Sequence, residues 1–458
     1  MSPRIYLIVL GLLTSSPLLG VPIKFLTTKD INVRGGLKIN TPGLYVLNED
    51  VTFTQANAAA ISISANDVTI DLNGRTLKAN AGGLTVGINI VTQFTAPNNF
   101  NDIYNILIKN GTIDNFNRFG IFINGGERYI TVENVAITNV DTTSRNAQVP
   151  AGIFINGNPF ALVSEVRIKN CAVIGGRYGL LAQYANNFVV RESVFSESFA
   201  AGASLLQSNL WDIRNCSFSN EPGTDGNGSA GLVSRGGSLL TIKNCDFSRN
   251  NATPTSSSMI GLSLIGLVNG PSGSHIVENC SFNNNTAATL ASGVQLVSTN
   301  SCVFRDCIAN GNFSSGAQAT GYSVITGSAG NLFERCIANG NFTFGAAALA
   351  AGFNITGTAN NIINCVAKEN FSSGAGGGQG FFFSSTAISG LVQNCLATGN
   401  SAFGFRNDST SAFVGNFATA NGTNYGGAGT IGFLTVINGA QPVGGSFDER
   451  QIDNIEVV

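Results

Sequence analysis

A phrase of glycine, apolar residue, any residue and apolar residue returns along the chain and constrains its fold more than any other feature. It occurs thirteen times, and 23 to 33 residues separate successive glycines. These are Gly87, Gly120, Gly152, Gly179, Gly202, Gly231, Gly261, Gly293, Gly321, Gly352, Gly380, Gly404 and Gly432. The alternation predicts a strand that buries every second side chain. Repetition at this spacing predicts a solenoid, in which each repeat is one turn stacked on the next.

A second column of short strands advances together with the first. Its anchors are Ile108, Val132, Ile168, Val190, Ile213, Ile242, Val277, Phe304, Phe333, Ile362, Val392 and Val414. The two shortest gaps between anchors are 22 and 23 residues, so one coil needs about 22 residues and longer repeats carry surface insertions. Two columns that advance together place parallel strands in separate sheets. The sequence therefore predicts a parallel β-helix.

This pattern resembles the right-handed parallel β-helix, or pectin-lyase-like, superfamily over roughly residues 40–440. The segment from Val68 to Leu77 is typical of the first coils of that superfamily. The resemblance implies an all-β chain with a single right-handed solenoid of about 13 coils, at residues 51–440. It does not select an activity, because the superfamily contains lyases, hydrolases, epimerases, adhesins and phage tailspikes.

The two ends of the chain differ from the repeats. Residues 1–20 read as a signal peptide, with Arg4 before a short apolar stretch, Ile5 to Leu13. We therefore expect export, to the cell surface, the periplasm or the medium, although an uncleaved N-terminal anchor is the alternative. Residues 21–50 are expected to form an N-terminal cap and first strand, and residues 441–458 a C-terminal cap or tail. No other stretch approaches a membrane span.

Eight of the nine cysteines occupy one repeat position, directly after an Asn in most coils. They are Cys171, Cys216, Cys245, Cys280, Cys307, Cys336, Cys365 and Cys395, and Cys302 lies elsewhere. Side chains in register point the same way and not at each other, so we expect free, buried thiols and no disulfides. A further Asn five residues after the cysteine is predicted to hydrogen-bond its neighbours in the coils above and below.

The outward positions of the glycine strands offer little catalytic chemistry. Asp408 is the one carboxylate among 26 such positions. A glycosidase of this fold needs two carboxyl groups, and a calcium-dependent lyase needs a cluster of them with a base. No catalytic residue, metal ligand or cofactor is therefore predicted from the strands. Acidic groups of a lyase or glycosidase would have to come from insertions, where candidates are Asp102, Glu127, Asp141, Glu221 and Asp225.

Two surface features could bind a partner. The first is an aromatic and amide patch, predicted from the residues Phe122, Phe154, Leu181, Asn124, Asn156 and Gln183. Exposed rings beside amides suit sugar rings, unless the insertion at 139–150 or 157–165 covers them. The second is a basic run that could contact a polyanionic glycan unless Glu192 and Asp212 offset its charge. Its members are Lys169, Arg191, Arg214 and Lys243.

The leading hypothesis is a secreted or surface-exposed β-helix protein that is glycan-binding or adhesive and catalyses no reaction. Its expected partner is a polysaccharide or a cell-surface glycan. The net charge of −2 gives no general attraction to nucleic acid. A polysaccharide lyase or glycoside hydrolase with loop-borne carboxylates is the second hypothesis. A structural surface-layer component is the third.

Overall fold

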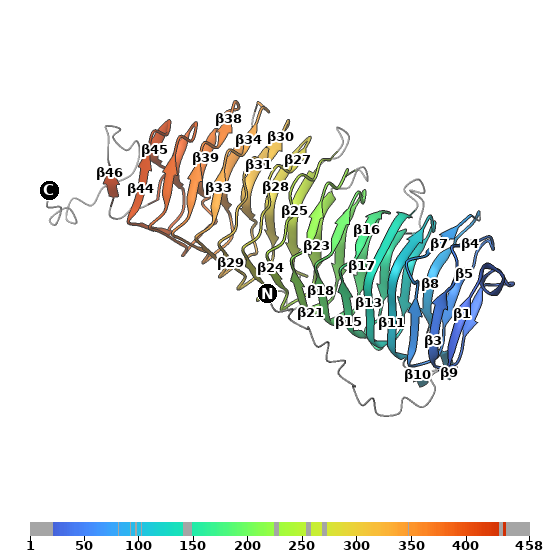
Figure 1. Ribbon diagram of the computed structural model, residues 1–458. Helices are drawn as coiled ribbons and strands as arrows, with labels where there is room; N and C mark the ends of the chain where they lie inside the picture. Colours follow the sequence, from blue (N-terminus) through green and yellow to red (C-terminus); the bar gives the residue numbers. More distant parts are fainter. Residues whose placement is uncertain are drawn as a thin grey trace, which may run out of the picture.

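The computed structural model describes residues 22–80, 82–91, 93–96, 99–101, 103–140, 149–223, 229–252, 258–267, 273–346, 348–429 and 434–436. The described chain forms a rod of stacked coils that follow one another in sequence order (Figure 1). All strand pairs that the structure describes are parallel except β9 (Gln93–Ala96) with β10 (Asn99–Asn101). The predicted all-β, single-solenoid fold is confirmed. The signal peptide and the C-terminal tail predicted at 441–458 lie outside the described residues.

One sheet, called the glycine sheet below, runs the length of the rod and contains the glycine phrases. Its fifteen strands are β2 (Leu37–Ile39), β5 (Ala59–Ile63), β8 (Val86–Val91), β12 (Phe119–Asn124), β14 (Ala151–Asn156), β17 (Tyr178–Gln183), β20 (Ala201–Leu206), β23 (Ser229–Arg235), β25 (Ser258–Ile265), β28 (Leu290–Val297), β31 (Gln318–Val324), β35 (Leu349–Ile355), β39 (Gly378–Phe383), β42 (Phe403–Asn407) and β45 (Thr423–Gly426). Two of these strands precede the first phrase at Gly87, so the estimate of about 13 coils is slightly low.

The second sheet of twenty strands bends around a corner and forms two rows. The row that carries the predicted anchors comprises β1 (Ile23–Leu26), β3 (Gly43–Leu47), β6 (Val68–Asp71), β11 (Tyr104–Asp114), β13 (Arg128–Val140), β15 (Val163–Lys169), β18 (Ala185–Arg191), β21 (Asn209–Arg214), β24 (Thr241–Lys243), β26 (Ile276–Glu278), β29 (Val303–Arg305), β32 (Leu332–Glu334), β36 (Asn361–Ile363), β40 (Leu391–Gln393) and β43 (Ala412–Val414). The long strands β11 and β13 pass through the corner and belong to both rows.

The other row closes the coil. Its strands within this sheet are β4 (Val51–Phe53), β7 (Thr76–Ala79), β16 (Ala172–Gly175), β19 (Val194–Ser196) and β22 (Ser217–Ser219), and a five-stranded sheet of β33 (Ile337–Asn339), β37 (Val366–Lys368), β41 (Leu396–Thr398), β44 (Asn416–Thr419) and β46 (Leu434–Val436) continues it. A small corner sheet contains β27 (Thr286–Ala287), β30 (Phe313–Ser314), β34 (Phe342–Thr343) and β38 (Phe371–Ser372).

At the N-terminal end, the short helix α1 (Thr28–Ile31) follows β1 and places Ile31 in the core. The side chain of Asn32 ties this turn to the first coils, because it bonds the backbone of Thr52 and Thr54 at 2.6 and 2.8 Å. Within the described residues, no helix has the length and apolar character that crossing a bilayer requires.

Two of the predicted repeat positions are wrong at the C-terminal end. Phe413 and not Val414 pairs with Val392, so the last anchor is displaced by one residue. The segment after Gly432 also leaves the glycine sheet, because β46 pairs with β44. The repeats diverge most in the last coils, where short phrases can be aligned in more than one register.

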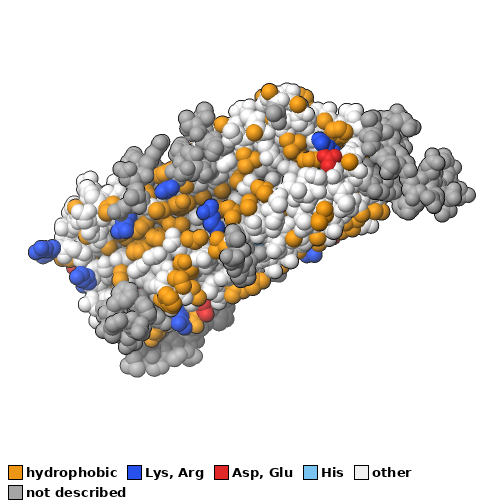
Figure 2. All heavy atoms as spheres, turned by 180° about the vertical axis from the view of Figure 1, so that it is seen from behind, with side chains coloured by type: hydrophobic (Ala, Val, Ile, Leu, Met, Phe, Trp, Pro, Cys, Tyr) orange, Lys and Arg blue, Asp and Glu red, His pale blue; other side chains and the backbone are white. Residues whose placement is uncertain are grey.

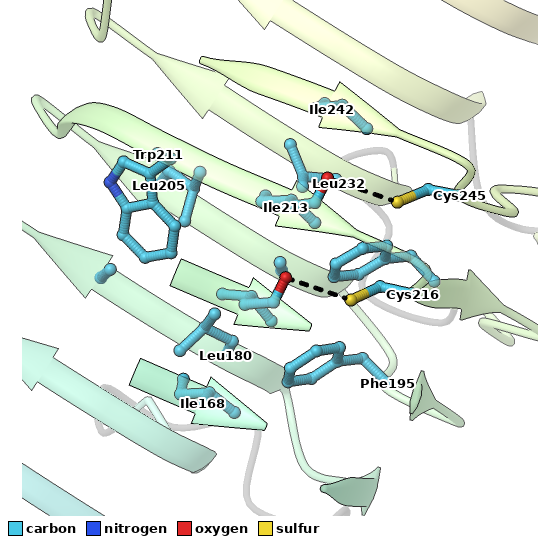
Figure 3. Close-up of a cluster of buried hydrophobic side chains, with 14 of the residues drawn as sticks. Ile168, Leu180, Phe195, Leu205, Trp211, Ile213, Cys216, Leu232, Ile242 and Cys245 are labelled. Carbon is cyan, nitrogen blue, oxygen red and sulfur yellow. Dashed lines mark hydrogen bonds between the residues drawn. The ribbon is translucent and has the colours of Figure 1, made fainter. Parts of the chain in front are cut away.

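The core is a continuous column of buried apolar side chains, stacked from coil to coil. Phe195, Phe218, Phe247 and Phe282 form one row with ring centroids 5.0–5.2 Å apart. Figure 3 shows how Phe195, Trp211 and the neighbouring aliphatic side chains fill the space between the sheets. Identical side chains in register can stack in this way because adjacent strands repeat at about 4.8 Å.

The predicted Asn ladder is confirmed. In consecutive coils from Asn250 to Asn421, the side-chain amide donates to the amide oxygen of the next coil's Asn at 2.8–3.0 Å. The residue that precedes each ladder cysteine, an Asn in most coils, has a positive φ of 50–55° and turns the chain between two rows. Both sets are structural, as the sequence indicates.

The predicted free thiols are also confirmed, since all nine cysteines are unbonded to one another and buried. Figure 3 shows the sulfur atoms of Cys216 and Cys245 directed at backbone carbonyl groups. Burial raises the pKa of Cys171 and of Cys302 to about 11, so their reactive thiolate is scarce at neutral pH.

This burial predicts the behaviour of the thiols toward a bulky disulfide reagent. We expect the native protein to react slowly and the denatured, unreduced protein to titrate all nine cysteines. Absorbance of the released chromophore measures both numbers. A value below nine after denaturation would show that disulfides join the coils and would contradict the ladder.

Candidate functional site

The glycine sheet presents three outward positions per strand, because each phrase glycine interrupts the alternation. A Cβ atom added to Gly120 would lie 2.5 Å from the Ile137 side chain and 2.8 Å from the carbonyl oxygen of Gly152. Gly120 and the buried Ile121 therefore both face the core, and the residue before the glycine points outward together with the second and fourth residues after it. Phe119 accordingly packs against Phe122 on the outer face, with ring centroids 4.9 Å apart.

Side-chain size along these three positions produces a groove. Bulky residues occupy β12, β14 and β17, whereas Ala201, Ser204, Ala230 and Val233 on β20 and β23 are small. The resulting groove has a volume of about 480 Å³. Its lining comes from β17, β20, β23, β25 and β28, together with Val149, Arg177 and Ala200 outside these strands. The strand residues include Tyr178, Leu181, Gln183, Ser204, Val233, Arg235, Ser263, Ile265 and Gln295.

Within the described part of the chain, both charged side chains in this lining are arginines. Arg177 precedes β17, and its guanidinium lies 5.7 Å from the ring centroid of Tyr178. Arg235 ends β23, is exposed, and has no ion-pair partner among the described residues. Serine hydroxyl groups and the amides of Gln183 and Gln295 supply neutral hydrogen-bonding groups. The face shown in Figure 2 combines a continuous hydrophobic area with Lys or Arg side chains along it.

The predicted aromatic and amide patch adjoins this groove and is half-buried. Phe122 and Phe154 stack with centroids 5.2 Å apart and both contact Phe119, so their ring faces are turned largely toward each other. Val149, at the end of the insertion predicted at 139–150, packs against this cluster, while residues 141–148 lie outside the described residues. Phe160, in the second insertion, is 93% exposed.

The other predicted patch residues lie beside the rings in the expected register. Asn124 pairs with Asn156, whose amide donates to the Asn124 side-chain oxygen at 2.7 Å, and Gln183 follows on β17. Leu181 is buried at 5% exposure between the rings and the groove. Leu181 and Gln183 thus line the groove itself, and the two Phe and two Asn residues form the surface at its N-terminal end.

The predicted basic run does form a row, since Lys169, Arg191, Arg214 and Lys243 occupy paired positions on β15, β18, β21 and β24. Three carboxylates offset much of its charge. Asp212 contacts Arg191 and Arg214 at 3.0 and 2.6 Å. Glu278 lies 2.6 Å from Lys243, and Glu192 lies 3.9 Å from Lys169. Polyanion binding at this row stays a prediction. The ion pairs disfavour such binding, because they already occupy the cations.

Of the loop carboxylates considered for catalysis, Asp102, Asp141 and Asp225 lie outside the described residues. Glu127 and Glu221 are fully buried. Burial raises the pKa of Glu221 well above its ordinary value, and its carboxylate accepts a hydrogen bond from the Ser198 backbone inside the coil. Neither side chain faces the groove. No three His, Cys, Asp or Glu side chains in the described part of the chain converge on a point where they could hold a metal ion.

His275, the single histidine of the chain, is a core residue. Its Nδ1 accepts a hydrogen bond from the backbone of Leu240 at 3.2 Å, and burial lowers its pKa to about 4. Between about pH 6.5 and pH 4 the unfolded chain binds a proton here that the folded chain does not. Stability should therefore fall as the pH drops through this window, by about 3 kcal/mol from this residue.

The single histidine makes this prediction simple to measure. We expect its NMR resonance to remain at the neutral position from pH 8 to pH 5 and to titrate near pH 4. Replacing His275 with Gln should flatten the acid side of the stability profile. A native-state midpoint near 6.5 would contradict the burial.

Comparisons with known proteins concern the fold. A family model described as "right handed beta helix region" matches residues 151–326. No curated protein matches the sequence. The A-module of mannuronan C-5 epimerase AlgE6 from Azotobacter vinelandii is a similar solved structure, with 13% identity, 92% of this chain and 99% of that chain covered, and a TM-score of 0.47.

Two other solved structures show the same degree of likeness. The periplasmic alginate epimerase AlgG has 11% identity over 89% of this chain and 79% of its own, with a TM-score of 0.46. A tailspike protein of E. coli bacteriophage HK620, in complex with a pentasaccharide, has 9% identity over 89% of this chain and 75% of its own, with a TM-score of 0.44. These identities are too low to indicate a shared activity.

Proposed function

We propose that this right-handed parallel β-helix binds an extended glycan with acidic groups in the groove of the glycine sheet, without cleaving it. The observation that carries this proposal is the lining of the groove. Among the residues that the structure describes, its two charged side chains, Arg177 and Arg235, are both cationic and flank a floor of Ser, Ala and Val side chains.

The dimensions of the groove suit several sugar units. It crosses five adjacent strands, β17 to β28, which corresponds to about 19 Å along the rod at the usual spacing between strands. A guanidinium group can bind a carboxylate or sulfate through two parallel hydrogen bonds. The serine hydroxyl and Gln amide groups can bind sugar hydroxyl groups, and Tyr178, Leu181 and Val233 provide apolar contact for the carbon-bound faces of the rings.

This function is consistent with a location at the cell surface, in the periplasm or in the medium, as the N-terminal twenty residues predict. The enzymatic alternative would draw on loop carboxylates, and the two that the structure describes, Glu127 and Glu221, are enclosed in the coils. The surface-layer alternative predicts association between rods and needs no groove.

Replacing Arg235 with Gln tests the proposal. We expect the affinity for an acidic oligosaccharide to fall by roughly 10- to 100-fold, because a hydrogen-bonded charge pair is lost from a partly enclosed site. Isothermal titration measures the change. Arg75→Gln is the matched control, since Arg75 is exposed in the turn between β6 and β7, outside the groove, and the charge change is identical. Equal losses in both variants would show that only net charge matters.

A further inference from the structure

Seven consecutive coils place a cysteine at one and the same register. They are Cys216, Cys245, Cys280, Cys307, Cys336, Cys365 and Cys395, called the thiol ladder below. Each is free, and none is more than 4% exposed. The column places seven soft donor atoms in one row inside the fold.

Hydrogen bonds hold the sulfur atoms in one repeated orientation. The Sγ atom of each ladder residue lies 3.2–3.5 Å from the carbonyl oxygen two residues earlier. In addition, the backbone N–H of Cys336 donates to the Sγ of Cys365 at 3.3 Å, and that of Cys365 donates to the Sγ of Cys395 at 3.4 Å. Successive sulfur atoms therefore repeat with the spacing of the coils, about 4.8 Å.

A buried phenol without a partner lies next to this column. Tyr322 on β31 is fully buried, and its hydroxyl group has no hydrogen-bond partner of good geometry among the described residues. It interacts electrostatically with the ladder thiols of Cys336, Cys307 and Cys365. A hydroxyl left unsatisfied in the core destabilises the fold by about 1–3 kcal/mol, so its presence beside a thiol requires an explanation.

We propose that adjacent thiols of the ladder bind a soft monovalent cation, Cu⁺ or Ag⁺, in linear two-coordinate sites, with the Tyr322 hydroxyl donating a hydrogen bond to the sulfur of Cys336. Two metal–thiolate bonds of roughly the length found for zinc, about 2.3 Å, span about 4.6 Å in a line, close to the ladder spacing. Soft thiolate ligands select Cu⁺ over harder cations. Two ligands suffice for such an ion, so no three-ligand cluster is needed.

The reaction is an exchange of protons for the cation. Two S–H bonds break, two metal–sulfur bonds form, and two protons leave to solvent for each ion, with no change of oxidation state. Access is easiest at the N-terminal end of the ladder. A shallow surface groove of about 660 Å³ is lined by Cys216, Cys245 and Cys280, which are 3–4% exposed, whereas the later ladder residues are 0–1% exposed.

Titration of the reduced, folded protein with Ag⁺ tests this inference, since Ag⁺ undergoes no redox change under these conditions. We expect native mass spectrometry to show at least one bound ion per chain, ultraviolet absorbance to show thiolate-to-metal charge transfer, and circular dichroism to remain that of the folded protein. Two protons should appear per ion. Cys302→Ser, outside the ladder, should bind as the parent does, and Cys336→Ser should bind fewer ions.

Tyr322→Phe separates a site from a packed column of thiols. Without the unsatisfied hydroxyl, the metal-free variant should melt at the same temperature as the metal-free parent or at a higher one. Its affinity for Ag⁺ at the Cys336 site should be about tenfold lower than that of the parent. The inference is overturned if the folded protein takes up no Ag⁺, if uptake occurs only as the chain unfolds, or if Tyr322→Phe binds Ag⁺ as tightly as the parent.

Discussion

Replacement of Asn341 with Ala is expected to lower the free energy of unfolding by about 3–5 kcal/mol, a value at the upper end for single substitutions. Asn341 is fully buried in the middle of the Asn ladder. Its amide donates to the side-chain oxygen of Asn370 at 2.9 Å, and its own oxygen accepts from the side chain and backbone of Asn312 at 2.8 and 3.1 Å. The substitution leaves the Asn312 side-chain amide and backbone N–H without this acceptor in the core, and it removes one of the donors to the Asn370 oxygen, which keeps the backbone N–H of residue 341.

Thermal and denaturant unfolding followed by circular dichroism measure this loss. Asn48→Ala provides the control, because Asn48 is exposed at the end of β3, and its replacement should change stability by no more than about 0.5 kcal/mol. Similar melting temperatures for both variants would mean that the amide ladder does not stabilise the coils.

The double replacement of Phe122 and Phe154 with Ala is expected to lower the free energy of unfolding by about 3–5 kcal/mol in total. Replacing one fully buried Phe with Ala has an effect of about this size, and each of these two rings is only half-buried. The two rings contact each other and Phe119, so the single losses should not add up to the double loss. Melting temperatures of the two single variants and the double variant measure the coupling.

This result would distinguish a supporting wall from a binding surface. The sequence-based hypothesis makes the two rings a direct sugar platform, and on that basis their removal should abolish glycan binding at little expense in stability. The stacked geometry instead makes them a wall at the end of the groove. An unchanged melting temperature together with lost binding would favour the platform.

Most of the fold could be predicted because its determinants are local and repeated. The Asn and Cys positions recur at the same place in each coil, so their register, burial and hydrogen bonding follow from one repeat. The errors lie where repetition fails, at Val414 and after Gly432. Two N-terminal coils were missed. At β5, Ala60 stands where later coils carry glycine, and this break separates β2, which does carry the phrase from Gly36 to Ile39, from the recognised series.

The groove could be predicted only in part. Strict alternation implies two outward positions after each glycine. The break in alternation at the glycine adds a third, which directs Tyr178, Ala201 and Ala230 to the groove. The alternation predicts outward side chains for Ser204, Val233 and Arg235. Whether a groove forms over them depends on their size relative to larger side chains in other coils, such as Phe154 and Gln295. The net charge of the basic run likewise depends on which carboxylates of neighbouring coils lie within ion-pair distance, such as Asp212 beside Arg191 and Glu278 beside Lys243.

The central claim is that the groove binds an acidic glycan without cleaving it. Isothermal titration of the intact protein with a panel of acidic oligosaccharides and their carboxyl-reduced counterparts tests it most directly, with reducing ends and unsaturated uronates assayed in the same mixtures. The account predicts saturable one-to-one binding of an acidic oligosaccharide, loss of that binding on carboxyl reduction, and unchanged sugar after incubation. Equal binding of the reduced and acidic forms, no binding to any member, or the appearance of cleavage products would contradict it.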